Sequence, residues 1–290
     1  MFEDFESRDI PTRGTTIHAV FGGSGPPLLL LHGYPQTHAM WHKIAPALAQ
    51  RFTVVASDLR GYGDSGKPAS DPAHEAYSKR VMAGDQVEVM ESLGYRTFFV
   101  CGHDRGGRVA HRMALDHADR VLGLAVLDIV PTRKVFSSVN KAVATGYYHW
   151  FFLIQGGGLP ETLIGHDPGY YLQAKLRQWT ADVSAFDREA LAEYLRCFRD
   201  PATIHASCED YRAAASIDLE HDEADLARKI ACPLLVLWGE KGLIGRHYDV
   251  LATWQERASD VRGRALPCGH FPAEERPEET LAELNAFFSA

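Results

Sequence analysis

The chain has 290 residues, of which 46% are hydrophobic and 23% are charged, and its formal net charge is −8. This composition is typical of a globular protein with a sizeable apolar core. The acidic balance, without any block of lysine or arginine, argues against a nucleic-acid partner. No apolar run reaches the roughly 18 residues that crossing a membrane requires, so we expect no membrane association.

The N-terminal stretch MFEDFESRDIPTRG is acidic and lacks the apolar segment of a secretory signal, which predicts a cytoplasmic location. The five cysteines are scattered, and no two form a Cys-x-x-Cys pair. Neither a disulfide framework nor a zinc site is therefore expected. We interpret most of the cysteines as small core residues. They stand at positions 101, 197, 208, 232 and 268.

Short apolar runs alternate with helical patterns along most of the chain. The runs are continuous, which is typical of strands buried on both faces of a parallel sheet. They cover residues 27–32, 52–58, 97–102, 121–128 and 232–239. Helices are expected at about 40–50, 75–94, 105–118 and 276–288. This order predicts an α/β fold in which helices cover both faces of a mostly parallel sheet.

The alternation stops between residues 131 and 215, where we find no good strand candidate and many aromatic residues. Periodic apolar positions in this segment favour helices. We therefore predict a helical cap at 131–215 inserted into one α/β core domain, which residues 1–130 and 216–290 form. The stretch 218–230 is predicted to be a solvated acidic helix that leads back to the core.

The stretch CGHDRGGRV at 101–109 has the frame of a nucleophile elbow, with Asp104 at its centre. In such a Gly-x-nucleophile-x-Gly turn, the glycines allow close backbone approach while the central side chain stays accessible. Aspartate also caps helices frequently, so an N-cap role for Asp104 is the alternative.

Other segments supply the remaining parts of a hydrolytic site. LLLLHGYPQ ends a strand with His-Gly-x-Pro, the usual place for one backbone N–H of an oxyanion hole, here that of Tyr34, while Arg105 would supply the second. His270 lies in a Gly-His loop before the last helix. Asp128, which closes the strand at 121–128, is the preferred acid to orient His270. Glu240 is the alternative acid, and Asp128 could instead cap the first helix of the cap.

An aspartate nucleophile suits displacement at a saturated carbon better than acyl transfer. The product is an ester of Asp104, which His270 hydrolyses by activating water, and the two N–H groups stabilise the oxyanion. Water is the only co-substrate required, so we predict no cofactor and no metal site.

The stretch GHDRGGRVAHRMALDHADRV at 102–121 resembles the fluoroacetate dehalogenases. The whole chain is similar to the haloalkane dehalogenase and epoxide hydrolase group of α/β-hydrolases. Members of that group usually have tryptophan after the nucleophile, whereas this chain has Arg105, and the fluoroacetate pattern has a second arginine where Arg108 stands. The resemblance implies an α/β-hydrolase fold with a mostly parallel sheet and an inserted helical cap.

Two guanidiniums beside Asp104 can bind a substrate carboxylate by charge-assisted hydrogen bonds. The alternative is that Arg105 and Arg108 are ion-paired or lie at the surface. The resemblance also implies a halide site, although such an aromatic cluster can simply be packing. Its residues are His149, Trp150 and Tyr211, with Lys175 and Trp179 at further pocket positions. Tyr34 departs from the family pattern, which has phenylalanine there.

These features predict a dehalogenase of small 2-haloacids that converts fluoroacetate into glycolate and fluoride. An epoxide hydrolase is the first alternative, because Tyr211 could protonate an epoxide oxygen. This reaction does not explain why two arginines stand beside Asp104. A non-catalytic small-molecule receptor on the same fold is the second alternative. The expected partner is the small haloacid substrate, and the sequence leaves a homodimer open.

Overall fold

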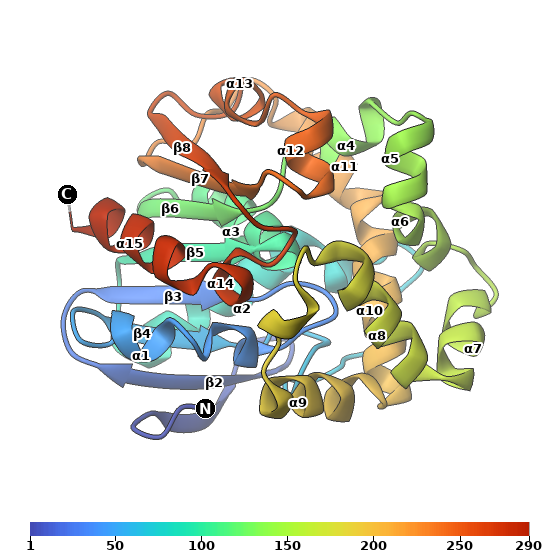
Figure 1. The fold of residues 1–290 in the computed structure, drawn as a ribbon, viewed down its shortest axis with the longest axis horizontal. Coiled ribbons are helices and arrows are strands. Elements are labelled where there is room, and N and C mark those ends of the chain that lie inside the picture. The colour runs from blue at the N-terminus through green and yellow to red at the C-terminus, as the bar shows by residue number, and fades with distance from the viewer. Residues whose placement is uncertain (290) are drawn as a thin grey trace.

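The structure is a computed structural model, and it describes residues 1–289 (Figure 1). Its centre is an eight-stranded sheet in the order β1-β2-β4-β3-β5-β6-β7-β8. The strands from β4 to β8 in this order run parallel, while β2 is antiparallel to both of its neighbours. The bounds are β1 (Glu6–Pro11), β2 (Thr16–Gly23), β3 (Pro27–Leu31), β4 (Thr53–Ser57), β5 (Phe98–His103), β6 (Val121–Leu127), β7 (Leu234–Gly239) and β8 (Val261–Leu266).

The α/β fold class is confirmed, and the five predicted strands correspond to β3 to β7. The sequence reasoning missed β1, β2 and β8. The reason is that β1 is exposed along nearly its whole length and β8 carries two arginines, so neither forms a continuous apolar run. Charged residues are common on edge strands, where one side of the strand meets solvent.

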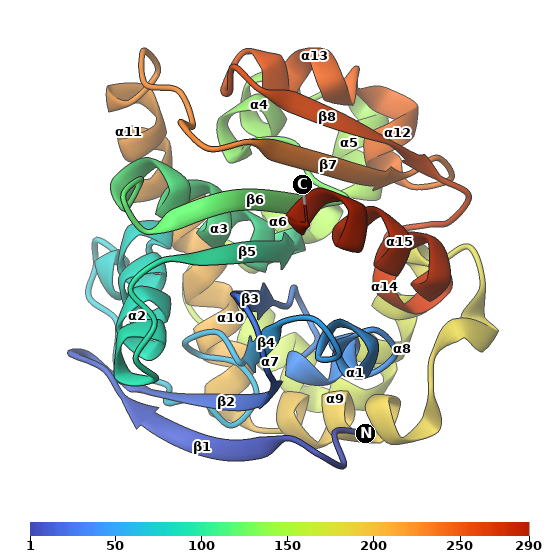
Figure 2. The ribbon, with the colours of Figure 1, turned by 90° about the vertical axis from the view of Figure 1, so that its left-hand side faces the viewer.

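The core helices are close to the predicted positions. The expected helix at 40–50 is instead a 3₁₀ turn, η1 (His38–Trp41), followed by the short helix α1 (Ala45–Leu48). The others are η2 (Glu75–Tyr77), α2 (Lys79–Ser92), α3 (Asp104–Asp116), α12 (Leu243–His247), α13 (Val250–Gln255), α14 (Pro272–Glu275) and α15 (Pro277–Phe288). Helices α2 and α3 cover one face of the sheet, and α1 and α15 cover the other (Figures 1 and 2).

Between β6 and β7 the chain is helical, as predicted. These helices are α4 (Thr132–Ser137), α5 (Lys141–Gly146), α6 (Tyr148–Leu153), α7 (Leu159–His166), α8 (Pro168–Trp179), η3 (Val183–Ala185), α9 (Arg188–Phe198), α10 (Pro201–Ala214) and α11 (Ile217–Ala224). Helices α6 to α10 gather at one end of the sheet, on the right of Figure 1. We propose to treat 131–215 as the cap and the two flanking segments as one core domain.

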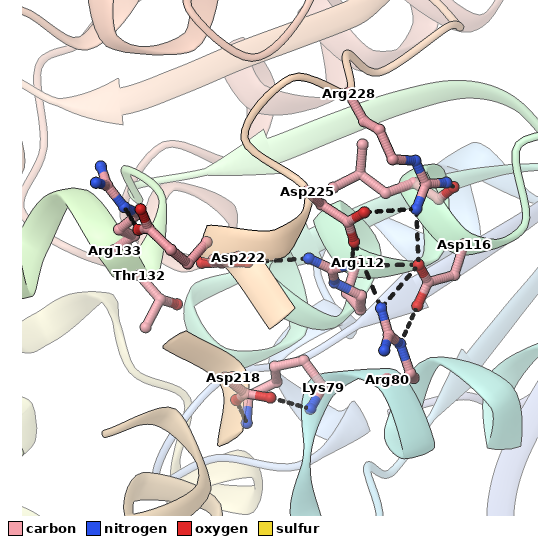
Figure 3. Close-up of polar contacts among 12 residues, drawn as sticks. Lys79, Arg80, Arg112, Asp116, Thr132, Arg133, Asp218, Asp222, Asp225 and Arg228 are labelled. Carbon is pink, nitrogen blue, oxygen red and sulfur yellow. Dashed lines mark hydrogen bonds and ion pairs between the residues drawn. The ribbon is translucent and has the colours of Figure 1, made fainter. Parts of the chain in front are cut away.

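The acidic segment at 218–230 differs from the prediction of a solvated helix. Helix α11 ends at Ala224, and Asp218 and Asp225 are only 4% and 8% exposed. The Arg112 guanidinium of α3 pairs with Asp222 and Asp225, and the Lys79 ammonium of α2 pairs with Asp218 (Figure 3). The acidic residues therefore join this helix to the core. The local sequence did not predict these contacts, because the partners lie far away in the chain.

Two further expectations concern the apolar parts of the molecule. Four of the five cysteines are buried and Cys232 is half-buried, and all five are free thiols, which confirms their interpretation as core residues. Across the residues that the structure describes, no helix combines the length and apolarity needed to cross a membrane.

Candidate active site

Asp104 stands at a sharp turn between β5 and α3. Its φ of +47° lies in the left-handed region, which non-glycine residues rarely adopt. A Cβ on Gly33 would come within 2.4 Å of the Asp104 Cβ, and one on Gly106 within 2.4 Å of the His32 carbonyl oxygen. Only glycine fits at both positions. The residues around the turn thus allow the elbow that the sequence predicted.

The Asp104 carboxylate does not cap the helix. The N-cap of α3 is His103, and Asp104 Oδ1 instead accepts a hydrogen bond of 3.0 Å from the backbone N–H of Tyr34. Asp104 is buried, and burial alone would raise its pKa. The positive charges of His270 and Arg108 outweigh this effect and hold the pKa below the ordinary value. The carboxylate is therefore ionised at neutral pH, as a nucleophile requires.

His270 and Asp128 complete a triad arrangement around Asp104. His270 Nδ1 lies 2.6 Å from Asp128 Oδ2, and its Nε2 lies 3.8 Å from Asp104 Oδ2. Asp128 Oδ1 accepts a hydrogen bond of 2.9 Å from the backbone of Gly239, which holds the carboxylate in place. Glu240, the alternative acid, is exposed at the end of β7. The geometry therefore favours Asp128 as the partner of His270.

The charge of His270 depends on the same contacts. Burial lowers the pKa of the imidazole, but its hydrogen bond to Asp128 and the charges of Asp128 and Asp104 raise it more, so the pKa lies above the ordinary value. An imidazole between two carboxylates can accept a proton from water and keep it as a stabilised imidazolium.

Arg105 is fully buried and forms an ion pair, which was the alternative interpretation of this arginine, with a partner that the sequence did not identify. Its Nε and Nη2 donate to the two carboxylate oxygens of Asp210 on α10, at 2.8 and 2.7 Å. Lys79 and Tyr62 contact the same carboxylate. Two of the three guanidinium nitrogens are thus ion-paired, as the alternative interpretation expected. Only Nη1 has no hydrogen-bond partner in residues 1–289.

Arg108 has a different environment. It is 3% exposed, and its Nη1 donates to the Val130 carbonyl and the Thr132 hydroxyl, at 2.9 and 3.1 Å. Its Nε and Nη2 lack a hydrogen-bond partner within the described part of the chain, where no carboxylate lies within 4.0 Å of it either. Burial and then the charge of Arg105 lower its pKa. A buried cation with unused donors is costly unless an anion binds there.

The three predicted cap donors lie beside these arginines. The ring centroids of His149 and Trp150 are 5.5 and 5.9 Å from that of Tyr211. The Arg105 guanidinium lies 4.1 Å from the Tyr211 ring centre, and that of Arg108 lies 4.5 Å from the Trp150 ring. Tyr211 Oη and His149 Nδ1 are buried without a hydrogen-bond partner among residues 1–289. Burial also keeps the pKa of His149 well below its ordinary value, so the imidazole is neutral.

Tyr34, Trp179 and Lys175 continue the same cluster. The Tyr34 ring is nearly parallel to His149 at 6.2 Å, and the Trp179 ring lies 4.6 Å from His149. Lys175 Nζ bonds to Gln178 and lies 5.2 Å from the Trp179 ring centre, and burial lowers its pKa to about 8. The structure therefore brings together all the predicted site residues except the alternative Glu240.

Comparison with known proteins agrees with this arrangement. Residues 26–277 match the family model for the alpha/beta hydrolase fold. The chain belongs to the α/β hydrolase family. It is 49% identical to a fluoroacetate dehalogenase of a Burkholderia species, over all of this chain and 95% of that protein. It is 38% identical to a soluble epoxide hydrolase of Corynebacterium sp. (strain C12), over 95% and 94% of the two chains.

A solved structure is closer still in sequence. The α/β hydrolase described here superposes on the crystal structure of ALR0039 from Nostoc sp PCC 7120 with a TM-score of 0.99. The two chains are 65% identical, and the match covers 100% of this chain and 99% of the other. This chain is therefore a hydrolase, and the chemistry of its site decides the substrate.

The α/β hydrolase also contains one group of side chains, among residues 1–289, that could hold a metal ion. Its members are His18, His38 and Asp58, with one ligand atom of each lying within 4.8 Å of the others. Both oxygens of Asp58 are already used, because Oδ1 accepts from the backbone of His38 and Oδ2 from that of Asp64, at 2.7 and 2.9 Å. The carboxylate serves to hold the loop after β4, and we assign no metal to this group.

A buried carboxyl group on α14 was missed by the sequence reasoning. Glu274 accepts a hydrogen bond from the Gln36 amide and contacts the Tyr194 hydroxyl at 3.0 Å. Burial raises the pKa of Glu274 to about 8. In the folded protein this carboxyl group is therefore protonated and neutral below that pH. In the unfolded chain it ionises near pH 4.3.

Replacing Glu274 by glutamine is expected to change how stability depends on pH. Between about pH 4.3 and 8 the folded state binds more protons at Glu274 than the unfolded state, so this residue makes stability fall as pH rises through that window. We expect Glu274→Gln to remove this fall, so that its stability relative to the wild type increases by roughly 3–4 kcal/mol between pH 5 and pH 8. Urea unfolding at pH 5 and pH 8 measures the difference. Glu278→Gln, at an exposed position, is the control, and parallel pH dependences for wild type and Glu274→Gln would refute the prediction.

Proposed function

We propose that this hydrolase removes halide from small 2-haloacids and converts fluoroacetate into glycolate and fluoride. The observation that carries the proposal is Arg108, a buried guanidinium with two unused donor nitrogens and no carboxylate partner in the described chain, four residues after Asp104. A substrate carboxylate would supply the missing anion, and Arg105 Nη1 would add a further donor. The likeness to the Burkholderia fluoroacetate dehalogenase supports the same substrate class.

The first step is a displacement by Asp104. Because the N–H of Tyr34 holds Oδ1, Oδ2 attacks the carbon that bears fluorine. The new bond joins Oδ2 to carbon, the C–F bond breaks, and fluoride leaves with its electron pair. The side chains of His149, Trp150 and Tyr211 would donate to the fluoride as its charge develops. Trp179 lies beside His149, and Lys175 lies beside Trp179.

The second step hydrolyses the ester. His270, oriented by Asp128, takes a proton from water, and the hydroxide attacks the carboxyl carbon of the Asp104 ester. Oδ1 becomes the oxyanion, which the backbone N–H groups of Tyr34 and Arg105 stabilise. The bond between the carboxyl carbon and Oδ2 then breaks, and glycolate leaves with Oδ2 and takes the proton from the His270 imidazolium. The Asp104 carboxyl group, which now holds the oxygen of the water, loses its own proton to solvent and is a carboxylate again. No cofactor and no metal take part in this scheme.

The direct test follows free fluoride with an ion-selective electrode after fluoroacetate is mixed with the purified enzyme. We expect release that is proportional to enzyme and time, and a loss of at least about 10³-fold in Asp104→Asn, which lacks the nucleophile. Halide release from chloroacetate but not from fluoroacetate would support a dehalogenase and would refute cleavage of the C–F bond. Equal release by wild type and Asp104→Asn would refute the nucleophile.

An epoxide hydrolase is the second candidate, favoured by the buried Tyr211 hydroxyl, which has no hydrogen-bond partner within residues 1–289. That group could protonate an epoxide oxygen, and the relative from Corynebacterium is a soluble epoxide hydrolase. A neutral epoxide leaves the Arg108 charge uncompensated, so we expect the enzyme to favour haloacids over epoxides of similar size. A receptor on the same fold would return its ligand unchanged. The cytoplasmic location and a homodimer stay predictions, which fractionation and light scattering would test.

A further inference from the structure

Glu275, the last residue of α14, has an unusual set of partners for a buried carboxylate. Its Oε1 accepts from the backbone N–H of Phe271 at 3.0 Å, and its Oε2 accepts from those of Gly269 and Ala181, at 3.0 and 2.8 Å. Among residues 1–289, no lysine, arginine or histidine nitrogen lies within 4.0 Å of it. Three peptide N–H groups therefore donate to the two oxygens of this carboxyl group.

Two of these peptide groups flank His270. The peptide of His270 itself is held on both sides, since its N–H donates to the Trp179 carbonyl at 2.9 Å and its carbonyl accepts from His103 Nε2 at 2.7 Å. The loop also lies against the cap turn, because a Cβ on Gly269 would come within 2.5 Å of the Trp179 carbonyl oxygen. The carboxylate of Glu275 thus joins two segments, 269–271 and 179–181.

We propose that Glu275 is a positioning residue that acts through His270. Its carboxylate holds the 269–271 loop so that Nδ1 of His270 meets Asp128 while Nε2 faces Asp104, and it couples this loop to the cap through Ala181. The proposal rests on the two-step mechanism proposed above. It predicts that Glu275 matters for ester hydrolysis, in which His270 activates water, and not for the displacement, which needs only Asp104.

The charge of Glu275 offers a second, independent measurement. His270 faces Asp104 and His103 at the β5–α3 turn, Asp128 after β6, and Glu275 from α14. Burial lowers the pKa of His270, while the hydrogen bond and charge of Asp128, the charge of Asp104 and then that of Glu275 raise it. Removing only the Glu275 charge should lower the His270 pKa, whatever the enzyme does to a substrate.

The experiment compares Glu275→Gln, Glu275→Asp and the control Glu278→Gln, which alters an exposed carboxylate three residues away. Rapid mixing with chloroacetate, acid quenching and intact-protein mass spectrometry give the rates at which the Asp104 ester forms and decays. In Glu275→Gln we expect formation at the wild-type rate and decay slower by roughly 10- to 100-fold, because a small displacement of a catalytic group has this effect. Glu275→Asp, which keeps the charge, should recover part of the rate, and Glu278→Gln should match the wild type.

The same variants are titrated by NMR of the histidine rings, with the His270 signal assigned by its absence in His270→Ala. A lower His270 pKa in Glu275→Gln is expected, together with slower ester decay. Equal slowing of formation and decay, or an unchanged His270 pKa, would overturn the positioning role and leave Glu275 with a structural role only. If no ester forms in any variant, the covalent mechanism fails and the role of Glu275 in ester hydrolysis fails with it, whereas the titration still shows whether the Glu275 charge acts on His270.

Discussion

Replacing His270 by alanine is expected to stop turnover after the first chemical step and to leave a carboxymethyl ester on Asp104. The charges of Arg108 and Arg105 still lower the pKa of Asp104 when the imidazole is removed, so we expect the carboxylate to displace halide in this variant. Hydrolysis of the ester needs a base, and His270 is the imidazole beside Asp104, with its Nε2 3.8 Å from Asp104 Oδ2. We expect one equivalent of halide per enzyme, followed by a steady rate at least about 10³-fold below that of the wild type.

Intact-protein mass spectrometry measures this effect directly. Incubation of His270→Ala with chloroacetate should add the mass of one carboxymethyl group, and peptide mapping should place it on Asp104. His205→Ala is the matched control, because that histidine is half exposed on α10 and should neither trap an ester nor slow turnover. A His270→Ala enzyme that loses activity without gaining mass would indicate that water attacks the substrate carbon directly.

Replacing Arg108 by glutamine is expected to remove most of the preference for charged substrates. In the scheme above, Arg108 binds the substrate carboxylate through its Nε and Nη2, the two donors that have no partner in residues 1–289. Truncating one partner of a buried charge pair costs about 2–5 kcal/mol, so kcat/KM for chloroacetate should fall by roughly 10²-fold or more. Chloroacetamide has the same size and no charge, and its kcat/KM should change by less than about tenfold.

Arg105 and Arg133 are the comparisons for this prediction. Arg105→Gln breaks the ion pair with Asp210 and leaves a buried carboxylate with fewer partners, so we expect it to lower the stability of the protein by about 3 kcal/mol. Arg133→Gln, at a partly exposed position on α4 where the guanidinium pairs with Glu223, should affect neither stability nor selectivity strongly. Equal losses on chloroacetate and chloroacetamide in Arg108→Gln would contradict an anion-binding role.

The parts of the fold and site that were predictable share a local signal in the chain. Five strands are continuous apolar runs, and the elbow is a run of five residues around Asp104 whose glycines are required by the close contacts of the turn. Asp104, Asp128 and His270 were predicted as parts of one hydrolytic site, because each stands in an elbow, at the end of a strand or in a loop before a helix. In the structure, His270 lies between the two carboxylates.

Other features depend on partners that no local pattern reveals. The sequence alone left Glu240 open as the acid, and only the hydrogen bond between His270 and Asp128 decides between them. It predicted two arginines that bind the substrate, whereas Arg105 is paired with Asp210, which lies 105 residues later in the chain. Arg108 has no carboxylate within 4.0 Å among residues 1–289, and two of its nitrogens lack a hydrogen-bond partner there. In the sequence, Glu274 and Glu275 are typical of the acidic first turn of a helix. Only the structure shows that both carboxyl groups are buried and hydrogen-bonded to other segments.

By itself, the sequence determined the α/β class, five of the eight strands and the elbow, because each of these depends on residues that are neighbours in the chain. Only the tertiary structure decided which charges are neutralised and which are left for a ligand. The physical reason is that the cost of a buried charge depends on every group within a few ångströms, and folding brings those groups together from remote positions.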